Sequence, residues 1–327
     1  MQMHKKFILL ATGGTIASVA GERGLRPAIS ASELLERIGV PGDMEIICRD
    51  VFALDSSNIQ PEEWQVLAQA VRTALKEADG VLITHGTDTM AYTAAALSFM
   101  LLGETKPVVI TGSQLPIGHP LSDATVNFLE ALSVLDQAER GVYVVFHHKV
   151  ILGTRAVKIR TTGFDAFHSV NAPLFGHIDA EGPHLSPPHR LFPLPARPDA
   201  IDSRVFLLKL IPGTSVEILD WVANAGYKGL VIEAFGLGGL HYIRRNLVDQ
   251  LHAIAERGVI TLVTSQCIYE KANFSLYEVG RGVLSQQVFS ARDMTTEAAV
   301  AKLMWVLGDA EHRLPLLQHS LCGEMSE

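Results

Sequence analysis

The sequence predicts an α/β fold, with a larger N-terminal domain built on a parallel sheet and a smaller C-terminal α/β domain. Three observations support this prediction: short apolar runs without polar alternation, helical stretches between them, and one proline-rich interruption. The chain has 327 residues, which exceeds the ~250–300 residues at which a single core usually stops growing. We expect domains over residues 1–180 and 205–327, joined by a linker over residues 181–204.

The expected strands are short runs that are apolar on both faces. Buried parallel strands have this pattern because helices cover both faces of the sheet. In chain order the runs are KFILLA (6–11), MEIICRDVFAL (44–54), GVLIT (80–84), PVVIT (107–111), GVYVVF (141–146), VFLLKL (205–210), GLVIEAF (229–235) and GVITLVT (258–264).

Helical patterns lie between these runs. In PEEWQVLAQAVRTALKEADG, apolar residues from Trp64 to Leu75 recur at three- and four-residue steps, with Pro61 at the start and Gly80 past the end. AAVAKLMWVLGDA, residues 298–310, has the same character. Alternation of strands and helices predicts parallel strands joined by right-handed crossovers.

The proline-rich interruption is EGPHLSPPHRLFPLPARPDA, residues 181–200. It holds six of the 15 prolines in the chain, and proline is excluded from helix interiors and central strands. We therefore interpret this segment as part of the interdomain linker.

Charge and cysteine content restrict the class of partner and the compartment. The net charge of −8 argues against nucleic acid or an anionic membrane as a partner. No segment approaches the ~18 apolar residues of a membrane helix. Cys48, Cys267 and Cys322 are far apart and have no metal or redox spacing, which favours a reducing compartment. We expect a cytoplasmic protein.

The first candidate motif is Thr12-Gly13-Gly14-Thr15, which ends the apolar run at residues 6–11. The glycines allow positive φ and a close approach to a ligand, and they leave N–H groups free to bind an anion. Thr15 then presents a hydroxyl at the end of the strand. A tight turn with a capping threonine is the alternative interpretation.

Three other expected strands also end in polar residues. They are followed by Asp55, Ser56 and Ser57, by His85, Gly86, Thr87, Asp88 and Thr89, and by Gly112, Ser113 and Gln114. Asp88 is also a suitable N-cap for the helix that starts near Met90. Ligands gather beyond the carboxyl ends of strands in open α/β sheets. The sequence therefore predicts a small polar pocket at these four strand ends.

These motifs resemble those of the bacterial L-asparaginases, with the greatest similarity to the cytoplasmic type I branch. The resemblance is carried by ATGGTIAS, DSSNIQPEEW, ITHGTDTMAYTAAALSFML, ITGSQLP and DMTTEAAVAKLMWVLG, and it extends over nearly the whole chain. It implies hydrolysis of L-asparagine to L-aspartate and ammonia. It also implies a homodimer or homotetramer built from tight dimers, in which the C-terminal domain of a neighbour completes each site.

The resemblance also assigns catalytic residues. Thr15 is the expected nucleophile, and Thr87, Asp88 and Lys158 match a second cluster. An amide is a poor electrophile, so attack by a hydroxyl needs a base and a site that stabilises the oxyanion. Lys158 would act as base if burial lowers its pKa, and Asp88 would hold both Lys158 and the substrate ammonium.

The resemblance further implies a substrate-binding set, in which the segment Asp55–Ser57 holds the α-carboxylate through hydroxyl and backbone donors. The full set is Gly14, Asp55, Ser56, Ser57, Gly86 and Ser113. This chemistry requires no metal ion and no cofactor.

Other polar features receive a structural interpretation. We expect His85 to be a hydrogen-bonded histidine at a strand end rather than a catalytic residue. His147-His148 has no partner motif for a metal site. The GLGGLH segment and the turn at Gly13 both lack the third glycine of a dinucleotide-binding motif.

Two departures from the family pattern affect the expected mechanism. Leu25 stands where most members carry a lid tyrosine, and Gly239 stands where many carry an asparagine that reaches the neighbouring site. We expect Tyr277 to supply the missing hydroxyl; an ordinary interface aromatic is the alternative.

Two other functions stay open. Archaeal amidotransferase subunits that release ammonia for glutaminyl-tRNA formation share both signatures, but they carry an N-terminal extension ahead of TGGT, whereas this motif begins at Thr12. The acidic net charge also counts against a tRNA partner. A catalytically weak amino-acid-binding homologue is the second alternative, and the departure at Leu25 favours it.

Overall fold

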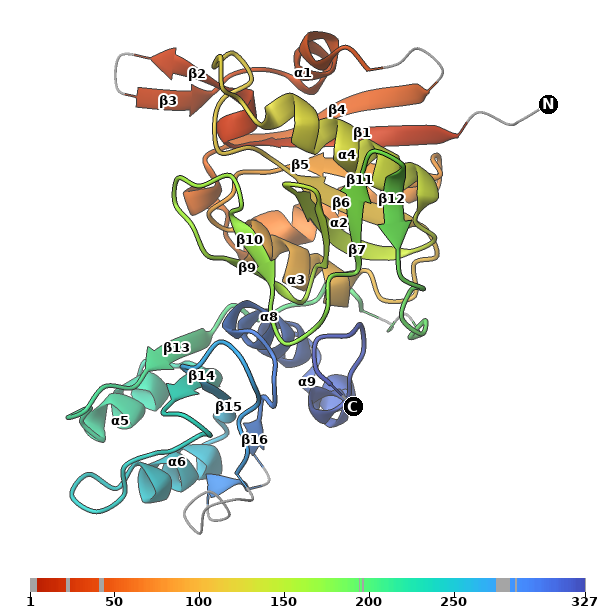
Figure 1. The fold of residues 1–327 in the computed structure, drawn as a ribbon. Helices are drawn as coiled ribbons and strands as arrows, with labels where there is room; N and C mark the ends of the chain where they lie inside the picture. Colours follow the sequence, from red (N-terminus) through yellow and green to blue (C-terminus); the bar gives the residue numbers. More distant parts are fainter. Residues whose placement is uncertain are drawn as a thin grey trace. The chain divides into compact units, whose positions relative to one another are not determined.

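The computed structural model describes residues 5–21, 24–40, 44–193, 195, 197–274, 283–285 and 287–326. These residues form two compact units, and the main boundary between the units falls between Asp199 and Ala200. Residues 170–172 group with the second unit. Figure 1 shows the ribbon of each unit.

The first unit is built on an eight-stranded sheet with the order β12-β11-β8-β7-β6-β5-β1-β4. The strands of this unit are β1 (Lys6–Gly13), β2 (Ser18–Gly21), β3 (Gly24–Pro27), β4 (Glu45–Leu54), β5 (Gly80–Thr84), β6 (Pro107–Thr111), β7 (Gly141–Phe146), β8 (Lys149–Leu152), β9 (Ala156–Lys158), β10 (Phe167–Ser169), β11 (Gly176–Asp179) and β12 (Gly182–Leu185). β2 pairs with β3, and β9 pairs with β10, as separate hairpins.

The large sheet combines a parallel and an antiparallel part. The five strands predicted from the apolar runs of this unit are confirmed, and β4, β1, β5, β6 and β7 are parallel neighbours. β8, β11 and β12 continue the sheet in antiparallel pairing. These three strands have only four residues each, which is too short for the apolar pattern to be distinctive.

Helices cover both faces of the sheet. They are η1 (Thr15–Ala17), α1 (Ala31–Ile38), η2 (Ser56–Asn58), α2 (Pro61–Leu75), α3 (Met90–Met100) and α4 (Ala124–Gln137). Phe7, Leu9 and Ala11 of β1 share one hydrophobic core with α1 and α4. α2 and α3 lie on the opposite side of the sheet (Figure 1).

The predicted helix from Pro61 is confirmed, and its start has a clear local cause. Gln60 and Glu63 form a capping box, and Pro61 occupies the first turn. The box satisfies N–H groups that have no partner inside the helix.

The second unit is a smaller α/β structure with a parallel sheet in the order β13-β14-β15-β16. Its elements are β13 (Val205–Lys209), α5 (Glu217–Asn224), β14 (Gly229–Ala234), α6 (Leu247–Glu256), β15 (Ile260–Ser265), β16 (Val288–Ser290), α8 (Thr296–Leu307), α9 (Ala310–Arg313) and η3 (Leu314–Gln318). The three strands and the last long helix predicted for this region are confirmed. Together the units confirm the predicted fold class.

The proline-rich segment differs from the linker that we expected over residues 181–204. Its first part forms β12, which lies at the edge of the large sheet, and the first unit continues to Asp199. An edge strand accepts Pro183 because only one side of it needs backbone donors. None of the helices in the described part of the chain combines the length and apolarity needed to cross a bilayer.

Candidate active site

The four strand ends that carry the candidate residues lie next to one another. β4, β1, β5 and β6 are consecutive in the sheet and run parallel. Their carboxyl ends therefore meet at one edge, which confirms the grouping predicted from the sequence. This edge is where α/β sheets bind ligands.

The two glycines after β1 are required by close backbone approaches. Gly13 and Gly14 have φ values of 101° and 77°, where other residues are strained. The Gly14 N–H donates to the Leu54 carbonyl at 2.9 Å, so the expectation that this N–H is free to bind an anion is wrong. A Cβ on Gly14 would lie 2.3 Å from the backbone nitrogen of Gly86. The Gly-Gly turn thus lets the end of β1 contact the segments after β4 and β5.

Thr15 begins the short helix η1 directly after this turn. Its side chain is half-buried. The Ser18 hydroxyl donates to the Gly14 carbonyl at 2.8 Å and fixes the turn. Among the described residues we find no hydrogen-bond partner for the Thr15 hydroxyl, so this hydroxyl is available to a ligand.

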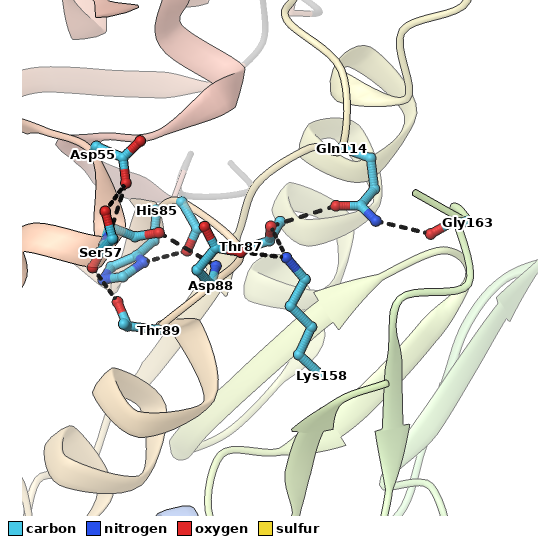
Figure 2. A network of polar contacts seen from close by, with 11 residues as sticks. Asp55, Ser57, His85, Thr87, Asp88, Thr89, Gln114, Lys158 and Gly163 are labelled. Carbon is cyan, nitrogen blue, oxygen red and sulfur yellow. Dashed lines mark hydrogen bonds and ion pairs between the residues drawn. The ribbon is translucent and has the colours of Figure 1, made fainter. Parts of the chain in front are cut away.

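Thr87, Asp88 and Lys158 meet in one cluster, which we call the lysine triad. Lys158 ends β9, and its Nζ donates to Thr87 Oγ1 at 2.7 Å and to Asp88 Oδ1 at 2.6 Å. Figure 2 shows Lys158 reaching both residues. The Lys158 side chain is 17% exposed, whereas that of Asp88 is 63% exposed. The lysine is therefore shielded, while the carboxylate stays open to a second cationic group.

The predicted capping role of Asp88 is wrong. The N-cap of α3 is Thr89, and no side chain caps this helix. The Asp88 carboxylate instead accepts from Lys158, and the Asp88 N–H donates to Ser56 Oγ at 3.2 Å. Thr89 donates to the Ser56 carbonyl at 2.7 Å. These bonds join the segments after β4 and β5.

The segment after β4 presents one carboxylate and two serines. Asp55 caps η2, and its Oδ1 accepts from the Ser57 amide at 2.9 Å and from the Ser57 hydroxyl at 2.6 Å. These bonds lower the pKa of Asp55. Ser56 is buried, and a Cβ on Gly86 would lie 2.5 Å from its Oγ. Gly86 is therefore needed for the close packing of Ser56.

Ser113 and Gln114 follow β6 and differ in what they contact. Ser113 is fully buried, and its hydroxyl donates to the Leu115 carbonyl at 2.5 Å. Its proposed contact with substrate therefore gains no support. Gln114 accepts from Thr87 Oγ1 at 3.4 Å and donates to the Gly163 carbonyl at 2.9 Å (Figure 2). The sequence placed Gln114 among the polar strand-end residues, but the family resemblance assigned it no catalytic or substrate-binding role.

His85 is a hydrogen-bonded histidine at the end of β5, as predicted. Its Nδ1 lies 2.7 Å from the Gly86 carbonyl, and its Nε2 lies 3.0 Å from Thr93 Oγ1. Trp64 donates to the same Thr93 oxygen at 3.1 Å. Complete burial lowers the pKa of His85 to about 4. A neutral ring that donates from Nδ1 and accepts at Nε2 satisfies every partner.

The positions that depart from the family pattern are only partly described. Leu25 lies on the β2–β3 hairpin, pairs with Ala20, and is 57% exposed. Gly239 makes a bridge with Phe235 in the loop after β14. Tyr277 lies outside the described residues, so its proposed role stays a prediction from the sequence.

Family models cover most of the chain. The model described as "Asparaginase, N-terminal" matches residues 6–189. The model described as "Glutaminase/Asparaginase C-terminal domain" matches residues 204–314. The chain belongs to the asparaginase family.

Similar proteins include both kinds of enzyme considered above. An L-asparaginase of Thermococcus kodakarensis is 40% identical over 98% of this chain and 99% of the relative. The solved structure of the thermostable L-asparaginase from that organism has a TM-score of 0.92, with 98% and 99% of the two chains covered. A glutamyl-tRNA(Gln) amidotransferase component of Pyrococcus furiosus is 39% identical, over 97% of this chain and 76% of the relative. The first relative is archaeal, so the bacterial label is not supported.

Proposed function

We propose that this family member hydrolyses L-asparagine to L-aspartate and ammonia through a threonine nucleophile. The observation that carries the proposal is the lysine triad, which lies at the same sheet edge as the Gly-Gly turn and Thr15. The similarity to an L-asparaginase over the full length of both chains supports the choice of substrate.

In the proposed first step, Thr15 Oγ attacks the side-chain amide carbon of the substrate. With Lys158 as the proposed base, the hydroxyl proton passes through the lysine triad to the amide nitrogen. The C–N bond breaks, ammonia leaves, and an ester joins the aspartyl group to Thr15. Water then attacks the ester carbonyl, which releases L-aspartate and restores the hydroxyl. A positioned base typically contributes ~10²–10⁴-fold to such steps.

The lysine triad would position this base. Thr87 accepts from Lys158 and is buried, so it fixes the ammonium or amine group in one place. We assign the exposed Asp88 carboxylate to the substrate ammonium as well as to Lys158. Opposite charges in contact form charge-assisted hydrogen bonds, which are the stronger kind.

The segment after β4 would hold the other end of the substrate. Ser56 Oγ accepts from the Asp88 amide, so its own hydroxyl proton stays available to a carboxylate. Asp55 has a lowered pKa and is anionic at neutral pH, so it would repel a carboxylate. We therefore revise its expected role: Asp55 orients Ser57, whose segment provides donors, rather than contacting the carboxylate itself.

Further properties of the protein are proposed from the family resemblance. We propose a homo-oligomer with shared sites, similarity to the type I branch, and a cytoplasmic location. The described cysteines, Cys48, Cys267 and Cys322, form no disulfide with one another, which is compatible with a reducing compartment.

The second candidate is ammonia release for tRNA-dependent glutamine formation. The 39% identity to an amidotransferase component favours it. A catalytically weak amino-acid-binding homologue is the third candidate. The three differ in the amide used, in the need for tRNA, and in turnover.

The deciding experiment measures ammonia release from asparagine, from glutamine and from a panel of other amides, with and without glutamyl-tRNA. The proposal expects tRNA-independent turnover that is fastest with asparagine. Turnover of glutamine that requires tRNA would favour the amidotransferase. Saturable asparagine binding without ammonia release would favour the binding protein.

A further inference from the structure

Two histidines and one aspartate form a cluster on the β11–β12 hairpin, at one edge of the large sheet. His177 and Asp179 belong to β11, and His184 belongs to β12. All three are exposed, and their potential ligand atoms lie within 4.8 Å of one another. It is the one group of three such side chains found within the described residues. We call it the histidine cluster.

The register of the sheet holds these side chains on one face. His177 and His184 are directly opposite partners in the antiparallel β11–β12 pair. Asp179 follows His177 by two residues, so its side chain points to the same face. The two imidazole rings are stacked, with centroids 4.8 Å apart and planes at 16°. Backbone pairing therefore brings the three groups together.

The Asp179 carboxylate is already oriented toward the rings. Its Oδ1 accepts from the Glu181 amide at 2.8 Å and lies 3.0 Å from His184 Nε2. Its Oδ2 lies 3.9 Å from His177 Nε2. These bonds fix the position of the carboxylate beside the two rings.

We propose that the histidine cluster binds Zn²⁺. Two imidazoles and one carboxylate suit Zn²⁺, whereas Mg²⁺ and Ca²⁺ prefer oxygen ligands alone. Bonds of ~2.0–2.2 Å in a tetrahedral site separate the ligand atoms by roughly 3.3 Å. His184 Nε2 and His177 Nε2 lie 3.0 and 3.9 Å from the two Asp179 oxygens, and all the ligand atoms lie within 4.8 Å of one another, so rotations of these exposed side chains would complete the site. Three protein ligands leave one position for water.

Neighbouring charges do not oppose the ion strongly. Lys149 of β8 lies opposite His177 on the other side of β11, but its ammonium forms an ion pair with Asp165. Strands β8, β7 and β6 separate the cluster from β5 in the sheet order. Metal binding at the histidine cluster is therefore independent of the proposed reaction.

The ion would join the edge strand β12 to its neighbour β11. β12 lies at the end of the strand order, and its Pro183, opposite Ile178, removes one backbone donor. A ligand that binds only the folded state stabilises that state. Zn²⁺ would therefore stabilise this edge and slow amide exchange at residues 176–185.

The test is calorimetric titration of the metal-free, full-length protein with Zn²⁺. We expect one site per chain that weakens by at least ~10–100-fold in His177→Ala and in His184→Ala, since outer-sphere partners alone contribute that much. Asp179→Asn keeps an oxygen acceptor for the turn, removes the charge, and should weaken binding less. His312→Ala is the matched control, because His312 is an exposed histidine bonded to Asp309 and should leave the site unchanged.

Two further measurements make the result decisive. Each variant without metal should keep the wild-type Tm and the wild-type rate of asparagine hydrolysis, which separates this proposal from the proposed function. Hydrogen exchange at residues 176–185 should slow with Zn²⁺ in the wild type and not in His177→Ala. Absence of Zn²⁺ binding in the wild type, or equal binding in a His177→Ala/His184→Ala double variant, would overturn the proposal.

Discussion

The threonines after β1 and β5 lie in different surroundings. Thr15 is half-buried at the start of η1, and no partner for its hydroxyl is found in the described part of the chain. Thr87 is buried, accepts from Lys158, and lies 3.4 Å from Gln114 Oε1. One threonine is held by side-chain hydrogen bonds on two sides, and the other is positioned only by its backbone.

This difference suggests a division of labour between the two strand ends. A nucleophile must reach the substrate, so a hydroxyl without competing partners suits attack. A proton acceptor must be held in one place, so a lysine bonded to a buried hydroxyl and a carboxylate suits base catalysis. The following predictions test this assignment, from the largest expected effect to the smallest.

Thr15→Ala should lower asparagine turnover by at least ~10³-fold, as expected when a nucleophile is removed. The fold should persist, because the substitution removes a hydroxyl and no core volume. Thr15→Ser keeps the hydroxyl and is the matched control, with much of the activity retained. Ammonia release measures turnover, and circular dichroism measures the fold. A Thr15→Ala enzyme that keeps more than a few per cent of the wild-type rate would identify another nucleophile.

Lys158→Met should lower kcat by ~10²–10⁴-fold, the usual contribution of a positioned base. Thr87→Val should also lower kcat. Thr87→Ser keeps the hydroxyl and should retain most of the wild-type kcat. Both losses should appear in kcat more than in KM, because the base acts in the transition state. Normal kcat in Lys158→Met would exclude this lysine as the base. The proposed division of roles between Thr15 and the lysine triad would then have no basis.

Asp88→Asn should lower kcat and raise KM together. The substitution keeps an acceptor for Lys158, but it removes the charge that we assign to the substrate ammonium. Steady-state kinetics on asparagine separates the two effects. A change in kcat alone would indicate that Asp88 only positions Lys158 and that the substrate ammonium binds elsewhere.

Tyr277→Phe should lower kcat by ~10-fold or more, because a lost catalytic hydrogen bond can cost up to ~10²–10³-fold. The motivation is Leu25, an exposed apolar residue on the hairpin that follows Thr15, where the family pattern has a tyrosine. Leu25→Tyr should restore part of the loss in the double variant. Full activity in Tyr277→Phe would indicate that the β2–β3 hairpin contributes only by excluding water from the site.

Much of the fold was predictable because buried parallel strands have a distinctive composition. GVLIT and PVVIT coincide with β5 and β6. The sequence could not predict β9, which has three residues, or β12, which begins within the proline-rich segment. Their existence depends on pairing with distant partners rather than on local pattern.

The site was predictable as a set of strand ends, but its internal contacts were not. Lys158 lies 71 residues after Thr87, so only the family resemblance joined them before the structure. The bond that draws the Asp88 carboxylate to Lys158 overrides the capping preference of an aspartate. The histidine cluster was not anticipated because it depends on the register of the β11–β12 hairpin.

The last prediction concerns His85, which supports the segment that carries Thr87. Its pKa is about 4 in the folded protein because of burial, against ~6.5 in an unfolded chain. The unfolded state therefore binds a proton that the folded state rejects. The free energy of unfolding should fall as pH drops from about 6.5 to about 4, by about 3 kcal/mol in total, and His85 should contribute no further change below that.

His85→Gln keeps a donor and an acceptor at this position but does not titrate, so it should remove this part of the pH dependence and lower kcat only slightly. His312→Gln is the control of opposite sign. The bond to Asp309 raises the pKa of His312, so the stability that it contributes is present below about pH 6.5 and is lost as pH rises through the folded pKa. Urea unfolding between pH 4 and 8 measures both. If His85→Gln kept the wild-type pH profile, His85 would not be a buried neutral group in the folded protein, and another residue would cause the loss of stability at low pH.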